Sequence, residues 1–203
     1  MVYPSFYCGP VMYYAALIGE EHAEFEAMEH FVKQTPRNRM TIDSPNGAVT
    51  LTLPIIKKSR KILMKDAEIN FAGNELAQHW QALQSTYGKS PFFDFYDYLF
   101  KPLFENPPTK LMDFNIQLHQ IVMDCLDQNQ SVSRTQTFSP VKNEYDSRVK
   151  YNVKQHNFLE HQPEYRQVFK AKNGFLKNLS ILDLLFNMGT ESRAYLLSVS
   201  SGK

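Results

Sequence analysis

The chain has 203 residues, a length that suits one domain over residues 1–203, and 43% of them are hydrophobic, which is enough for a sizeable core. Its 22 basic and 21 acidic residues give a formal net charge of +1, which argues against a protein that binds nucleic acid through its overall charge. No stretch reaches the roughly 18 apolar residues of a membrane span, no signal peptide is recognisable, and two cysteines without metal-ligand spacing indicate a cytoplasmic protein that holds no metal.

The N-terminal part predicts mixed structure. Residues 9–18 predict a short buried helix, because an apolar run follows a proline that suits the first helical turn. Residues 22–33 are ambiguous, since apolar and acidic side chains alternate as in a strand while the composition favours a helix. Residues 62–70, which follow a basic loop at 57–61, predict a strand.

Residues 37–54 are the most informative stretch and predict a β-hairpin. Its turn is Ser44-Pro45-Asn46-Gly47, in which proline presets φ and Asn-Gly tolerates positive φ. Apolar residues alternate with threonines after the turn, as in a half-buried strand. We therefore expect an α+β fold in which a small antiparallel sheet, with this hairpin near the N-terminus, is packed by several helices.

The second half of the chain is mostly helical. Four segments have apolar side chains at helical spacing or lie between capping residues, and they predict helices at 74–87, 90–103, 109–125 and 178–189. Pro102 should kink or end the second of these helices. Residues 128–157 are polar and predict a long surface loop with a short strand near 132–138.

The hairpin also contains the most conspicuous charges. Strand periodicity places Arg37 and Arg39 on one face, with Asn38 opposite. Two adjacent guanidinium groups repel each other unless an anion or a carboxylate lies between them. They predict either a clamp for the phosphate or carboxylate of a ligand, or an internal ion-pair network. The carboxylates considered for such a network are Asp66, Glu68 and Asp183. Asn38 either recognises a sugar hydroxyl or satisfies the backbone of the turn.

Asp183 lies inside an apolar segment, where a carboxylate needs a partner because desolvation costs several kcal/mol. We expect an arginine of the hairpin to be that partner. Asn187, four residues later, shares its helix face and would complete the same network. The role of Asp183 is either structural or catalytic, since perturbed carboxylates also mark functional sites.

Three further side chains are candidates for chemistry. His79 precedes Trp80 at the edge of an apolar helix face, where an imidazole serves either as a general base or as a hydrogen-bonding group at the border of the core. Tyr87 and Lys89 lie just before the helix start at Ser90, and helix N-termini attract anions. They would join the arginines around an anionic ligand, or they form only a capped turn with a solvated lysine.

These residues together resemble the WbqC-like family of bacterial proteins. The resemblance is carried by Lys33-Gln34-Thr35, Arg37-Asn38-Arg39, Pro45-Asn46-Gly47, Leu51 to Ile55, His79-Trp80, Tyr87 to Phe93, Asp113-Phe114-Asn115 and Asn178 to Gly189. It implies a role in surface-polysaccharide and O-antigen biosynthesis, and it leaves the reaction open because the family has no securely assigned one. Many relatives have His-Gln-Pro near the N-terminus, where this chain has Tyr3-Pro4-Ser5-Phe6-Tyr7.

The resulting hypothesis is a cytoplasmic transferase-type enzyme that acts on an activated sugar, or on its acyl or amino donor, in surface-polysaccharide synthesis. Its expected partner is a small anionic molecule such as a nucleotide sugar, and no cofactor is expected. The catalytic candidates are His79 and Asp183, and the substrate-binding candidates are Arg37, Asn38, Arg39, Tyr87, Lys89 and Asn187. The alternative is a non-catalytic binding or scaffold protein.

Overall fold

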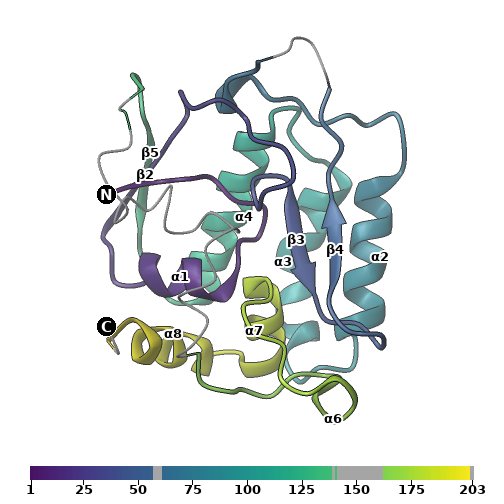
Figure 1. Ribbon diagram of the computed structural model, residues 1–203. Helices are drawn as coiled ribbons and strands as arrows, with labels where there is room; N and C mark the ends of the chain where they lie inside the picture. Colours follow the sequence, from purple (N-terminus) through teal and green to yellow (C-terminus); the bar gives the residue numbers. More distant parts are fainter. Residues whose placement is uncertain (57–60, 139, 141–161, 202–203) are drawn as a thin grey trace.

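The structure, a computed structural model, describes residues 1–56, 61–138, 140 and 162–201 (Figure 1). Most of the basic loop and residues 141–157 of the predicted surface loop lie outside this part. The described residues form a mixed α+β fold, as predicted, and they contain two separate sheets where one was expected. The strands are β1 (Val2–Tyr3), β2 (His22–Phe25), β3 (Arg39–Ile42), β4 (Val49–Thr52) and β5 (Ser131–Arg134).

The predicted hairpin is confirmed. Strands β3 and β4 pair antiparallel, with Arg39 opposite Thr52. The hydroxyl of Ser44 donates to the carbonyl of Gly47 over 2.6 Å, and Gly47 has φ +97°, a conformation that glycine adopts without steric cost. Met40 points inward and is buried, and the outward-facing Thr41 shares a hydroxyl hydrogen bond with the opposite strand.

The second sheet is parallel, and the sequence analysis did not predict it. Its strand order is β1-β2-β5, so the N-terminus and residues 131–134 flank β2. The sheet resolves the ambiguity at 22–33 in favour of a strand, and the strand predicted near 132–138 is confirmed in part.

The strand predicted at 62–70 is wrong. This segment contains the short 3-10 helix η1 (Met64–Asp66). Its backbone bonds go to several partners: the Met64 amide donates to the Glu29 carbonyl, and Ile69 donates to the carbonyl of Thr109. A segment whose hydrogen bonds are divided among separate neighbours cannot form a continuous ladder with one strand.

The helices are α1 (Val11–Leu17), α2 (Glu75–Tyr87), α3 (Phe93–Glu105), α4 (Leu111–Cys125), α6 (Lys170–Asn173), α7 (Ile181–Met188) and α8 (Glu191–Ser201). The five predicted helices are confirmed as α1, α2, α3, α4 and α7, with boundaries that shift by a few residues. Helix α3 continues past Pro102 to Glu105, and α8 was not predicted. In Figure 1 the hairpin lies in front of α2 and α3, and the parallel sheet lies on the opposite side of the molecule from α2.

The core is rich in aromatic side chains, and α7 is central to it. Every side chain from Ile181 to Asn187 is buried, as the apolar segment predicted. The ring of Phe186 packs against Tyr87 of α2 and against Phe93 and Phe100 of α3, with ring centroids 5.0–6.1 Å apart. Full burial of such a side chain contributes about 1.5–3 kcal/mol, so α7 holds the helices and the hairpin together.

Candidate functional site

Arg37 is neutralised inside the protein. It precedes β3, so the strand periodicity that placed it beside Arg39 does not extend to it. Its Nε and Nη2 each donate to an oxygen of Glu29 over 2.7 Å, and the guanidinium lies over the ring of Phe6. The ion pair was predicted as one alternative, but the expected partners were wrong. Glu29 follows β2 and is brought to Arg37 by its backbone bond with η1.

The other two residues of the hairpin start differ from Arg37. Asn38 is buried, and its Nδ2 donates to the carbonyl of Leu53 over 2.7 Å, so it satisfies the hairpin backbone. Arg39 is half-buried, and its Nε is shielded from solvent without a hydrogen-bond partner in the described part of the chain. Of the two arginines, Arg39 is therefore the one whose charge is not paired with a carboxylate in the described part of the chain.

Asp183 is fully buried and is held by neutral donors, which corrects the expected pairing with a hairpin arginine. Its Oδ2 accepts from the hydroxyl of Tyr165 over 2.6 Å and from Nε2 of Gln167 over 3.1 Å, and Tyr87 also bonds to the carboxyl. Asn187 donates to the Asp183 carbonyl over 2.8 Å. Burial raises the pKa of Asp183 to about 6, although the three hydrogen bonds act in the opposite direction.

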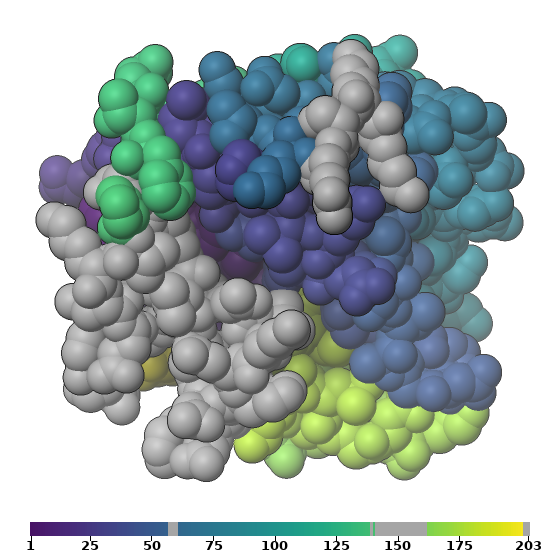
Figure 2. Space-filling model, turned by 45° about the horizontal axis from the view of Figure 1, so that its top comes forward, coloured from purple at the N-terminus to yellow at the C-terminus, as the bar shows by residue number. Residues whose placement is uncertain are grey.

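This buried network, which we call the Asp183 network, joins three parts of the chain. The hydroxyl of Tyr87 accepts from the amide of Asp43 at the hairpin turn. The carboxylate of Asp43 in turn accepts from the Phe169 amide and from Nδ2 of Asn173. Figure 2 shows the yellow-green C-terminal segment, to which Phe169 and Asn173 belong, lying against the blue hairpin turn. The predicted site residues Tyr87, Asp183 and Asn187 thus come together, in the interior.

The Asp183 network gives a testable pH dependence. Because the pKa of Asp183 is about 6 in the folded state and 3.8 ordinarily, its contribution to stability is complete below pH 3.8 and is lost as the pH rises through 6. The free energy of unfolding of Asp183→Asn minus that of the wild type should therefore increase by about 2 kcal/mol between pH 4 and pH 7. Denaturant titrations measure this difference, with Asp94→Asn at an exposed position as the matched control. A difference that stays constant with pH would contradict the assignment.

His79 is also buried, and its Nδ1 is 3.0 Å from the hydroxyl of Tyr7, with the two rings stacked. Burial lowers the pKa of His79 to about 4, and the nearby carboxylate of Glu75 opposes this only in part. The imidazole is therefore neutral at pH 7 and bonded within the core. Lys89, by contrast, is exposed and forms no ion pair with any described residue.

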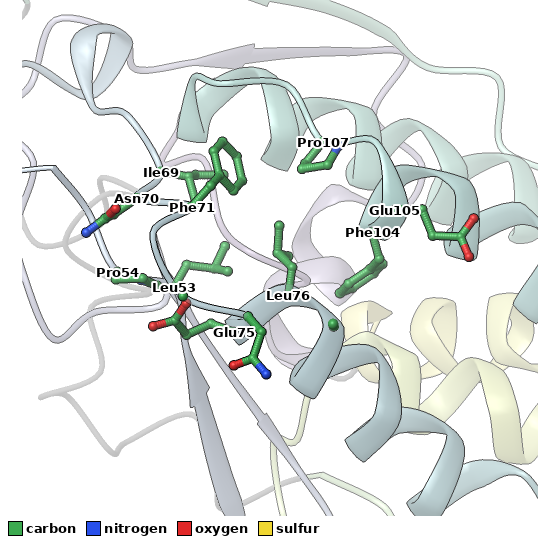
Figure 3. A pocket seen from close by; sticks show the side chains of 13 residues that line it. Leu53, Pro54, Ile69, Asn70, Phe71, Glu75, Leu76, Phe104, Glu105 and Pro107 are labelled. Atoms are coloured by element: carbon green, nitrogen blue, oxygen red, sulfur yellow. The ribbon is translucent and has the colours of Figure 1, made fainter.

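A hollow of about 200 Å³ opens beside the start of α2, and we call it the α2 hollow (Figure 3). It is lined by Leu53, Pro54, Ile69, Asn70, Phe71, Gly73, Asn74, Glu75, Leu76, Ala77, Phe104, Glu105 and Pro107. Figure 3 shows Leu76 between Leu53 and Phe104, with Phe71 on the opposite side of the space and Glu105 directed away from it. Apolar cavities of about 150 Å³ bind benzene, so the hollow has room for one six-membered ring.

Glu75, one of the acidic residues that line the hollow, has a carboxylate oxygen without a hydrogen-bond donor. It opens α2, where the helix dipole favours a negative charge. Its Oε2 is shielded from solvent and has no hydrogen-bond donor within the described residues. An unsatisfied buried acceptor costs about 1–3 kcal/mol, and a ligand donor would remove that cost only once the Glu75 side chain turns to expose this oxygen.

None of the eight predicted site residues lines the α2 hollow, although Asn38 bonds to the carbonyl of its Leu53. Sequence reasoning missed Glu75 because an acid at a helix start is ordinary. The hollow is assembled from residues 53–54, 69–77 and 104–107, and no local pattern connects those segments.

The described chain is thus an α+β protein in which a hairpin is packed on helices, and no described helix has the length and apolar content needed to cross a bilayer. It matches the model of the WbqC-like protein family over residues 10–158 and 150–195, and it belongs to that family. No curated protein and no solved structure matches it.

Proposed function

We propose that this protein binds a sugar unit of a surface-polysaccharide precursor in the α2 hollow. The observation that carries the proposal is the lining, which combines an apolar floor with amide and carboxylate groups. A pyranose ring has an apolar C–H face and an edge of hydroxyl groups, and ligand sites of this kind pair apolar walls with a few polar groups. The pathway itself comes from the resemblance to the family.

Transferase activity is the second candidate function. It is favoured by the position of Glu75, whose carboxylate belongs to the lining of the hollow at the start of α2. A transfer to a sugar hydroxyl requires a base that accepts the proton of that hydroxyl, and a carboxylate at the hollow is suited to this step.

Glu75→Gln is expected to weaken sugar binding about 10-fold or more, because a hydrogen bond to a charged acceptor contributes about 1.5–3 kcal/mol. Phe71→Ala should weaken it as well, since the ring is 45% exposed at the hollow and supplies an apolar surface. Saturation-transfer NMR with a panel of methyl glycosides, followed by calorimetry of those that bind, measures the effect.

The matched controls are Glu105→Gln, whose carboxylate is directed away from the hollow, and Phe95→Ala, an aromatic residue on α3 that is 66% exposed. Both should bind like the wild type. The proposal is rejected if no glycoside binds the wild type at millimolar concentration, or if all four variants behave alike.

A further inference from the structure

The charges at the α2 hollow distinguish between classes of sugar. The described residues of its lining include two acidic ones, Glu75 and Glu105, of which Glu105 is directed away from the space, and they include no lysine, arginine or histidine. A diphosphate placed here would meet the carboxylate of Glu75 without a cation from the described lining to neutralise it. A nucleotide sugar, the ligand that the hairpin arginines predicted, is therefore poorly matched to this hollow.

The N-terminus of α2 does not make the hollow a better site for an anion such as a nucleotide sugar. A helix N-terminus attracts anions, but here the chain's own carboxylate at Glu75 already occupies the first helical position. An added anion would have to displace that carboxylate or lie beside it. The group that complements the hollow is instead a hydrogen-bond donor that carries positive charge.

We propose that the ligand of the α2 hollow is an amino sugar with a free, protonated amine, which donates to the carboxylate of Glu75 while the ring packs on Leu76 and Phe104. This inference rests on the proposed sugar binding and names its substrate class. An ammonium group has three donors and no acceptor, so it pairs with the half-buried carboxylate of Glu75 without introducing a new unsatisfied group.

The size and polarity of the hollow limit how the ligand lies. Asn70 and Asn74 belong to the lining, whereas the floor is apolar. Their Oδ1 atoms already accept from the Ala72 amide and from Nε2 of Gln78, so their Nδ2 groups are the ones left to donate to ring hydroxyls. One ring fills the space, so the amine and the apolar face of the same ring both contact the protein. This geometry requires the amine to be attached directly to the ring.

Calorimetry with methyl glucosaminide, its N-acetyl derivative and methyl glucoside tests the inference. At pH 6 the amine should bind the wild type at least 10-fold more tightly than either neutral sugar. The preference should disappear in Glu75→Gln and persist in Glu105→Gln. A simple amine alcohol, 2-aminoethanol, should bind more weakly than the amino sugar because it lacks the ring.

A pH titration of the wild type gives the same information without a substitution. Raising the pH until the amine is deprotonated should reduce its affinity to that of methyl glucoside. Equal affinities of the charged and neutral sugars, or a preference that survives in Glu75→Gln, would overturn the amine inference and leave sugar binding intact. Absence of binding by all three sugars would overturn the proposed function as well.

Discussion

Arg37→Ala is expected to lower the free energy of unfolding by about 3–5 kcal/mol, because it leaves the carboxylate of Glu29 enclosed without its partner. Arg37 is 5% exposed and Glu29 is 12% exposed, and the two form a bidentate pair with distances of 2.7 Å. The substitution also removes the contact of the guanidinium with the ring of Phe6. Denaturant unfolding at pH 7 measures the loss.

Two comparisons show whether this loss comes from the unpaired charge. Replacing both partners, as Arg37→Met with Glu29→Leu, should recover most of the stability, because a buried ion pair contributes little beyond an apolar pair of similar size. Lys101→Ala removes an exposed ion pair with Glu105 and should cost less than about 1 kcal/mol. If Arg37→Ala is as mild as Lys101→Ala, then Arg37 is not a structural group, and its role as a ligand clamp regains support.

Acid is expected to destabilise the protein through its two buried histidines. Burial lowers the pKa values of His79 and His119 from 6.5 to about 4. The unfolded chain therefore binds more protons than the folded one in this window, so the stabilisation is complete above pH 6.5 and is lost as the pH falls through 4. Each histidine should cost about 3 kcal/mol of stability between pH 7 and pH 4.

His119→Gln isolates one of these contributions. His119 packs between the rings of Tyr14 and Phe25, and its Nε2 lies 2.7 Å from Oε1 of Gln130. The variant will be less stable at pH 7, but it should lose about 3 kcal/mol less than the wild type on acidification. The exposed His22→Gln is the matched control. An acid dependence that is unchanged in His119→Gln would contradict the neutral, buried state.

The two acid effects have opposite signs and can be measured separately. As the pH falls from 6 to 3.8, the protonation of Asp183 stabilises the folded protein. The two histidines destabilise the folded protein over an overlapping pH range. The two histidines together outweigh the one carboxylate, so net acid destabilisation is expected. Only differences between each variant and the wild type assign the contributions to individual groups.

Local patterns were sufficient for much of the fold. The turn at Ser44-Pro45-Asn46-Gly47, the apolar spacing of α2 and the capping of α7 between Ser180 and Gly189 are each contained in a few consecutive residues. Such features depend on φ preferences and on side-chain periodicity, which act over short distances. They were predicted for that reason, whereas α8, whose apolar residues form no clear stripe, was not.

The sequence by itself also indicated which polar residues would need partners, namely Arg37, Asp183 and His79. It could not indicate which partners these would be. Glu29 reaches Arg37 only after β2 and η1 are in place, and Tyr165 reaches Asp183 only when the C-terminal segment folds against the hairpin. The choice among competing carboxylates and hydroxyls is therefore made by tertiary packing.

The parallel sheet and the α2 hollow were determined only by the tertiary structure. Strand β5 joins β2 across more than a hundred residues, and the hollow collects Leu53, Glu75 and Phe104 from three separate segments. Burial of the apolar faces of the helices and the hairpin sets these distances, and no nearby residues encode them. The sequence determined the local secondary-structure elements and which buried polar groups require hydrogen-bond or ion-pair partners. Long-range packing decided which residues are those partners and where a hollow large enough for a ligand forms.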